Sequence, residues 1–455
     1  MSVVDGDPVV DGTAASAAPR SRAFAEAVLP QAPPSALPRG RLAAGYGAAF
    51  AAAMAFQLLM PAGWSRLERV WAEDGARFLL DGITQPFTAN LVAPYGGYLH
   101  VLPRLAAELV SVLPLEWAAV AFTVLAAVPR ALVALLVFTA SGGYLRPLPV
   151  RFAHAALVVV LPAGNSEPLD NVANLHWFLL YGVFWALLWR SGPRVPVTAF
   201  VVLAALSSPL VFVLVPVALL RLAVPRGRVV PLAFLAAAAV QGLVMVFAER
   251  TPYSHDPADP VQVLLAGLLR VPVVAFLGSE QVERYYPVHG NLPVLGALLL
   301  AGLPVLAGLR WGDRAGRLLV VLGVGYGALV IAGTLVANWT RVLQVQQPGV
   351  VTTGQRYSVA PCLFLFSAVA VGLALVPRER WARLAVGAGR VVVAVVVLYS
   401  VVQHVRVDGG VLDGVPWGES VARGRGQCAA GAPVARFEHE PENWFFEVPC
   451  HHLDR

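Results

Sequence analysis

The sequence predicts an all-α polytopic membrane protein of about eleven transmembrane helices, and three observations lead to this class. Hydrophobic residues make up 58% of the 455-residue chain, charged residues make up 13%, and mean hydropathy is +0.68. Apolar stretches close to the length of a membrane span recur, and arginine, proline or glycine closes each one. Arginines concentrate in alternate loops. These features exclude a soluble globular domain.

The first 41 residues mix Ala, Pro, Ser and Asp without periodicity, so we expect a disordered cytoplasmic tail over residues 1–41. The transmembrane domain should cover residues 42–403. Its first apolar run follows Arg39 and Arg41 and should be a retained helix that starts in the cytoplasm. The expected spans are 42–61, 117–139, 152–163, 175–189, 196–206, 210–221, 229–248, 291–309, 318–337, 359–376 and 386–403.

Arginine sets the expected orientation of these spans. The chain has no lysine, and its arginine-only, Ala- and Val-rich composition indicates a GC-rich bacterial genome such as an actinobacterial one. Arginine-rich loops should face the cytoplasm of a protein in the inner (plasma) membrane, which places the C-terminus outside. These arginines are Arg146, Arg151, Arg190, Arg194, Arg221, Arg226, Arg228, Arg310, Arg314, Arg317, Arg378, Arg380 and Arg383. The net charge of +6 therefore reflects topology and not nucleic-acid binding.

Two apolar segments are expected to lie outside as juxtamembrane helices. Residues 98–113 carry His100, Arg104 and Glu108 at four-residue spacing, which makes one helical face polar and allows the helix to lie along the interface. Residues 261–277, with Arg270 at their centre, are placed outside on the same grounds. The alternation of arginine-rich loops requires both placements.

The C-terminal tail, residues 404–455, is polar and should be extracytoplasmic. Its last residues are aromatic and β-branched, which favours a small sheet. Cys428 and Cys450 would share an oxidising compartment and are expected to form a disulfide, the alternative being two unpaired thiols. Cys362 lies in an apolar span and should pack as a small hydrophobic residue.

The first outer loop, residues 62–116, carries the most informative polar residues. Trp71 precedes the adjacent carboxylates Glu73 and Asp74, and His100 and Arg104 follow in the same loop. In one reading the carboxylates only cap a short helix, where negative charge at an N-terminus is favourable. In the other, one carboxylate is a general base that deprotonates a sugar hydroxyl during attack at an anomeric carbon.

This loop, the many spans and the late outer arginines resemble the GT-C class of membrane glycosyltransferases. The local motif that carries the resemblance is Trp-x-Glu-Asp-Gly, residues 71–75. The resemblance implies a polyprenyl-phosphate sugar as donor, a cell-envelope glycan or lipid as acceptor, and a catalytic carboxylate at Asp74, the first choice, or Glu73. It implies no cofactor; the acidic metal-binding pattern of oligosaccharyltransferases is missing from the sequence, which leaves a divalent cation open.

A lipid-phosphate donor needs cations at the outer interface, because the leaving phosphate must be neutralised. Arg341, Arg356 with Tyr357, and Arg104 are the candidates. Snorkelling beside an aromatic belt is the ordinary alternative for Arg341 and Arg356, and an ion pair with Glu108 is the alternative for Arg104.

The polar loop before the span at 175–189 adds Asn174 and His176, whose side chains, like that of His100, are expected to contact substrate. An outer loop needs polar groups in any case, so a purely structural role is the alternative. Arg130 lies in mid-span, where it is costly in hydrocarbon unless it meets a partner or a water-filled cavity.

Three functions compete on these observations. The preferred one is inverting sugar transfer, with Asp74 or Glu73 as base and the arginines on the phosphate. The second is a transporter or flippase of lipid-linked sugars, which needs the cations but no base; no internal repeat supports it. The third is a non-catalytic scaffold whose outer tail binds envelope partners. Membrane lipid is a partner in every case.

Overall fold

The computed structural model describes residues 20–32, 37–60, 66–165, 167–225, 227–249, 256–345, 347–406 and 414–453. Within them the chain is mostly helical, with one two-stranded antiparallel sheet, β1 (Val434–His439) and β2 (Trp444–Pro449). The α-helices are α1 (Arg20–Val28), α2 (Arg39–Leu59), α3 (Leu80–Thr84), α4 (Phe87–Val92), α5 (Val101–Ser111), α6 (Ala118–Ala140), α7 (Leu148–Val160), α8 (Leu175–Leu188), α9 (Arg194–Ala205), α10 (Val215–Leu222), α11 (Val229–Phe247), α12 (Pro260–Leu268), α13 (Val274–Leu277), α14 (Ser279–His289), α15 (Leu292–Trp311), α16 (Arg314–Ala337), α17 (Val359–Ala374), α18 (Arg380–Arg406) and α19 (Trp417–Ala429).

Eight helical stretches of the described chain are long and apolar enough to cross a membrane, so the protein is a multi-pass membrane protein. They are Arg39–Leu59, Leu115–Gly143, Val229–Phe247, Pro260–Leu277, Leu292–Trp311, Arg314–Ala337, Gln355–Ala374 and Arg380–Val405. Seven of them overlap expected spans. The other four expected spans correspond to shorter apolar helices, Leu148–Gly164, Leu175–Leu188, Arg194–Ala205 and Pro209–Leu222. The total of about eleven spans stays a prediction.

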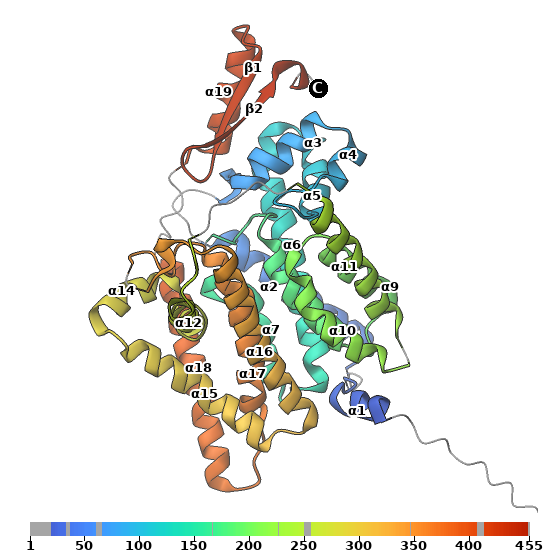
Figure 1. The fold of residues 1–455 in the computed structure, drawn as a ribbon, viewed down its shortest axis with the longest axis vertical. Coiled ribbons are helices and arrows are strands. Elements are labelled where there is room, and N and C mark those ends of the chain that lie inside the picture. Colours follow the sequence, from blue (N-terminus) through green and yellow to red (C-terminus); the bar gives the residue numbers. More distant parts are fainter. Residues whose placement is uncertain are drawn as a thin grey trace, which may run out of the picture.

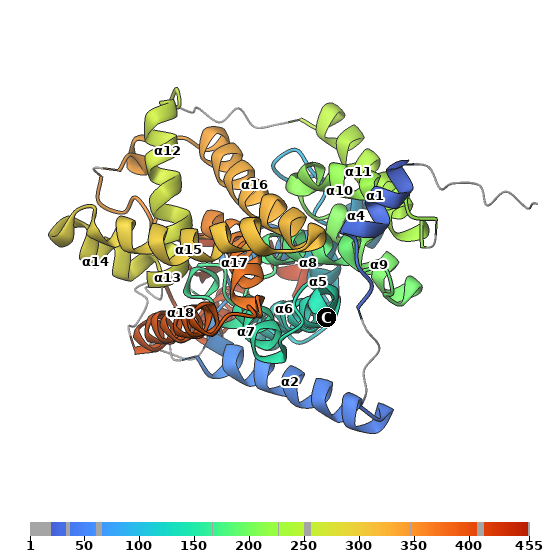
Figure 2. The same ribbon diagram turned by 90° about the horizontal axis from the view of Figure 1, so that it is seen from below.

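The eighth stretch, Pro260–Leu277, is the segment expected to lie outside. Its length and composition would allow it to cross. However, α12 points along the line of view in Figure 1, roughly perpendicular to α16 and α17, and is seen along its length in Figure 2. A helix that lies across the bundle is compatible with a place at the interface, so the expected placement also stays a prediction.

Arg130 explains how the short helix α7 can end inside the bundle. This side chain lies in the middle of α6 and donates hydrogen bonds to the carbonyl oxygens of Val158 and Val159, at 2.8 and 2.7 Å, and of Gly164 at 2.8 Å. The last carbonyls of α7 are thus satisfied well inside the bundle, where lipid offers no donor. The chain then passes through residues 161–174, here called the buried loop. Arg130 is therefore a partner of main chain and not a misplaced charge.

The two ends of the bundle differ (Figure 1). The segment between α2 and α6, called the first loop, places α3, α4 and α5 at the upper end together with the C-terminal sheet. We call this the loop end. The turns between α15 and α16 and between α17 and α18 lie at the opposite end, with α1. We call that the turn end.

The expectation of a disordered tail over residues 1–41 is wrong for residues 20–28. They form α1, whose Ala25 and Val28 are buried, and the Arg190 guanidinium donates to the carbonyl oxygen of Leu29 at 3.0 Å. The apolar side chains at these positions find a surface on the bundle, which the polar composition around them concealed. Residues 1–19 and 33–36, and Arg226 of the arginine set, lie outside the described residues.

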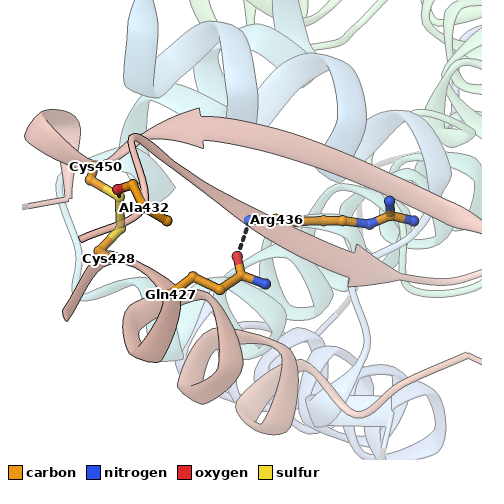
Figure 3. Close-up of a disulfide and its surroundings, with 5 residues drawn as sticks. All are labelled: Gln427, Cys428, Ala432, Arg436 and Cys450. Atoms are coloured by element: carbon orange, nitrogen blue, oxygen red, sulfur yellow. Dashed lines mark hydrogen bonds between the residues drawn. A yellow bond between two sulfur atoms is a disulfide. The ribbon is translucent and has the colours of Figure 1, made fainter. Parts of the chain in front are cut away.

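The C-terminal tail folds into a small domain over residues 414–453, called the C-terminal domain. Helix α19 packs on the hairpin, and Trp417 contacts Phe437 and Phe446 at ring-centroid distances of 6.0 and 6.2 Å. Cys428 and Cys450 form the disulfide expected from the sequence, with Cα atoms 5.6 Å apart (Figure 3). The expected sheet is confirmed, because β1 and β2 pair along their whole length.

Candidate functional site

Three segments meet at the loop end. They are the start of the first loop around Glu73 and Asp74, the buried loop, and residues 347–358, here called the late loop. The short 3₁₀ turns Pro162–Gly164 and Gln355–Ser358 are in contact, which joins the buried loop to the late loop. We take their junction as the candidate functional site.

Asp74 joins the first loop to the buried loop. Its two carboxylate oxygens accept hydrogen bonds from the backbone N–H groups of Val172 and Ala173, at 2.8 and 2.9 Å, and the residue is only 1% exposed. Burial raises the pKa of Asp74 to about 8, although the two N–H donors and Arg69 act in the opposite direction. Both oxygens are therefore committed to main chain. This geometry does not favour Asp74 as the base that contacts a substrate.

Glu73 is the carboxylate that remains available. It is half-buried, and no described residue forms a hydrogen bond or an ion pair with its side chain. Its charge acts on the Tyr98 phenol: burial raises the pKa of Tyr98 first, the negative Glu73 raises it further, and the positive Arg356 lowers it. Glu73 and Arg356 therefore both lie within electrostatic reach of Tyr98, although the three residues come from different parts of the chain.

Aromatic and imidazole rings line this junction. Tyr98 stacks against His100 with centroids 4.0 Å apart, His176 meets Trp177 at 4.7 Å, and Trp177 meets Tyr357 at 5.9 Å. Burial, and then the nearby His176, lower the pKa of His100 to about 3, so its imidazole is neutral at pH 7. Neutral rings of this kind offer both stacking surfaces and hydrogen bonds to a ligand.

Several polar atoms here have no partner. Both ring nitrogens of His176 and the indole Nε1 of Trp177 are buried, and no described residue forms a hydrogen bond with them. A buried polar group left unpaired costs about 1–3 kcal/mol, so such groups are rare outside functional sites. A ligand rich in hydroxyl or phosphate oxygens would satisfy them.

Arg356 is the partly exposed cation that we assign to this junction. Its guanidinium lies 5.0 Å from the ring centroid of Tyr357 and forms an ion pair with Glu167 of the buried loop. Glu167 also accepts the backbone N–H of Arg356 at 3.2 Å. The Arg356 side chain remains 34% exposed, so further N–H groups of its fork can reach a ligand.

Sequence reasoning missed the residues that shape the late loop. The Arg270 guanidinium, fully buried, donates to the carbonyl oxygens of Val350, Thr353 and Gly354. From the other side, Glu283 accepts the backbone N–H groups of Gly349 at 3.2 Å, Val351 at 2.9 Å and Thr352 at 3.4 Å. The sequence offers Arg270 as a single arginine in an apolar segment, and on sequence grounds it indicates the placement of residues 261–277 and not a loop-binding role.

The other candidates are Arg104, Arg341 and Asn174. Arg104 is fully buried within the first loop, where it pairs with Asp81 at 3.0 Å and contacts Asn90, so its partner is not Glu108. Arg341 is exposed in a short 3₁₀ helix, Arg341–Leu343. Asn174 is buried at the start of α8, and its N–H donates to the Asn171 side chain at 3.0 Å. Arg104 therefore has a structural role in the first loop, whereas the expected roles of Asn174 and Arg341 stay predictions.

No group of three or more His, Cys, Asp or Glu side chains is arranged to hold a metal ion in the part of the chain that the structure describes. Comparison with known proteins returned no matching family model, curated protein or solved structure.

Proposed function

We propose that this protein is a membrane glycosyltransferase that moves a sugar from a polyprenyl-phosphate donor to a cell-envelope glycan or lipid. The observation that carries the proposal is that one junction at the loop end holds the partly exposed Arg356, a row of aromatic and imidazole rings, and Glu73, a half-buried carboxylate with no side-chain partner among the described residues. A base, a phosphate-binding cation and sugar-stacking rings are the parts that glycosyl transfer requires. We retain the likeness to the GT-C class, with Glu73 in place of Asp74 as base.

In this mechanism Glu73 takes the proton of the acceptor hydroxyl, and the acceptor oxygen forms a bond to the anomeric carbon. The bond from that carbon to the phosphate oxygen breaks, and its electron pair leaves with polyprenyl phosphate. Arg356 keeps Glu167 on one edge and neutralises the phosphate with the other, since guanidinium has five donors. Attack and departure on opposite faces invert the anomeric configuration.

We further propose that the loop end is extracytoplasmic, in an inner (plasma) membrane crossed about eleven times. Arginine-rich turns lie at the turn end, together with α1, which supports a cytoplasmic N-terminus. The Cys428–Cys450 disulfide belongs to the C-terminal domain at the loop end, and disulfides persist in oxidising compartments. Lipid-linked sugar would then reach the site from the outer leaflet.

The test is an in vitro assay of the purified protein with a panel of polyprenyl-phosphate sugars. We expect Glu73→Gln to lower kcat by on the order of 10²-fold or more, because amide replaces the base. Glu68→Gln, an exposed carboxylate on the same loop, is the matched control and should keep its activity. Arg356→Ala should raise donor KM and lower kcat together. Wild-type turnover by Glu73→Gln would end the assignment of the base.

The same assay separates transfer from transport. A transferase releases free polyprenyl phosphate, whereas a flippase moves the intact donor and leaves the bond from sugar to phosphate unbroken. Sealed vesicles with labelled donor on one side would therefore show either product or redistribution. No observation at the site favours transport over transfer.

A further inference from the structure

The C-terminal domain binds the main chain that carries Glu73. The backbone N–H of Ala72 donates to the Glu440 carbonyl oxygen, and the N–H of Glu440 donates to the Val70 carbonyl oxygen at 3.1 Å. Trp71 and Glu440 thereby form a parallel β-bridge. Residues 70–72 thus continue the edge of the C-terminal hairpin, although they are far from it in sequence.

The same domain also holds the far end of the first loop. The Trp417 indole N–H donates to the Leu115 carbonyl oxygen at 2.7 Å, and Arg425 forms an ion pair with Glu116 at 2.6 Å. Trp417 is almost fully buried in the core of the domain. Both ends of the first loop are therefore attached to one folded unit.

The C-terminal domain also contacts Gly75, directly after Glu73 and Asp74. His439 is buried against Gly75, and a Cβ atom at Gly75 would approach the His439 Nε2 to 3.0 Å. The other ring nitrogen of His439 lies 3.0 Å from the carbonyl oxygen of Glu440, which fixes the ring. Glu73 and Asp74 thus stand on a segment held by a β-bridge on one side and a tight glycine contact on the other.

The C-terminal domain is small, so its stability should depend strongly on the disulfide. It comprises about 40 residues, and domains of that size rarely have a sufficient apolar core. The Cys428–Cys450 bridge ties α19 to the end of β2 (Figure 3), whereas His439 and Glu440 lie at the other end of the same hairpin. Loss of the bridge should loosen the packing of α19 on the hairpin, and through the hairpin it should reach residues 70–75.

We propose that the disulfide-closed C-terminal domain is a positioning element of the candidate site, and that His439 and Glu440 set the main chain of residues 70–75 and with it the position of Glu73. The domain acts through the first loop, which it contacts with the His439 side chain and the Glu440 main chain. The effect on catalysis rests on the proposed function, whereas the effect on the position of residues 70–75 does not.

Hydrogen exchange in lipid nanodiscs tests the positioning directly. In Cys428→Ser/Cys450→Ser we expect exchange in a peptide covering 70–76 to accelerate by at least about tenfold, with a peptide from α17 unchanged. Arg423→Ala, whose partners Glu419 and Glu438 lie within the domain, is the matched control and should exchange like wild type. Mild reduction of the folded wild-type protein replaces the double variant if that variant does not fold. Unchanged exchange at 70–76 would overturn the proposal.

Turnover distinguishes positioning from general support. We expect Gly75→Ala to lower kcat about tenfold with donor KM within about twofold, because a misplaced base slows the reaction without weakening binding. A methyl group at position 75 would meet both the His439 ring and Val70 Cγ1 at 3.0 Å, and His439→Ala removes the first of these contacts, so Gly75→Ala/His439→Ala should recover part of the kcat lost by Gly75→Ala. Accelerated exchange with unchanged kcat would contradict positioning. Absence of transfer by the wild-type protein would count against the proposed function, and the exchange result would still decide whether the domain holds residues 70–75.

Discussion

The buried loop and the late loop are held by the same device from opposite sides of the candidate site. Arg130 binds carbonyl oxygens of the buried loop region and Asp74 binds its N–H groups, whereas Arg270 and Glu283 do the same for the late loop. In each case buried arginine and a carboxylate satisfy an irregular main chain: Arg69 also donates to the Leu169 carbonyl oxygen of the buried loop at 2.9 Å. An ion pair from Glu167 to Arg356 then connects the two loops.

The difference between the loops lies in burial. Leu169, Asn171 and Val172 of the buried loop are fully covered, whereas several residues of the late loop, among them Thr353, are exposed. Loops with fewer buried contacts open at lower free energy. The buried loop is therefore the more rigid of the two, and the late loop is the one that can adjust. In both, a buried arginine in an apolar helix binds main chain rather than substrate.

The largest expected effect comes from the buried loop. Arg130→Met removes the donors of three carbonyl oxygens and should lower the free energy of unfolding by on the order of 3 kcal/mol or more. Arg130→Lys keeps the charge but loses the forked guanidinium donors, so its free energy of unfolding should lie between those of wild type and Arg130→Met. Thermal denaturation in detergent would measure this, with the exposed Arg314→Met as control. If Arg130→Met melts at the temperature of wild type, Arg130 does not stabilise the buried loop as described.

A smaller, local effect is expected from the late loop. Arg270→Met should accelerate hydrogen exchange and proteolysis within residues 347–358, because three carbonyl oxygens lose their donor in a loop already partly exposed. Glu283→Gln should do the same to a lesser degree, since an amide oxygen accepts hydrogen bonds more weakly than a carboxylate. Helix α6 should be unaffected. If Arg270→Met destabilises the whole protein as much as Arg130→Met, the two loops do not differ as proposed.

The smallest effect is a pH dependence carried by Asp74. Its folded pKa of about 8 lies above the unfolded value, so the folded state keeps a proton that the unfolded state has lost between about pH 4 and pH 8. This group therefore contributes less stability as pH rises through that window, and its contribution is level above it. The melting temperature of wild type relative to Asp74→Asn should fall from pH 5 to pH 8. If the melting temperature of wild type relative to Asp74→Asn rises from pH 5 to pH 8 instead, the two N–H donors lower the pKa of Asp74 by more than burial raises it.

The membrane class, the helical architecture, the C-terminal sheet and the favoured pairing of Cys428 with Cys450 are predictable from the sequence alone. Apolar runs, arginine turns and the shared compartment of two cysteines are local or compositional signals, so they survive without knowledge of contacts. The sequence also singled out the segment 71–75 and the pair of Arg356 with Tyr357, because polar residues beside apolar spans are conspicuous.

Which of those residues are available for chemistry depends on contacts that form only in the folded chain. Glu73 and Asp74 are adjacent and chemically alike, and they differ because Asp74 meets N–H groups about a hundred residues away while Glu73 does not. Likewise Arg104 and Arg130 became scaffold, and residues 20–28 became a helix, through partners distant in sequence. Hydrogen bonds between irregular segments leave no periodic trace in the sequence, so the division of polar residues between support and chemistry appears only when the chain is folded.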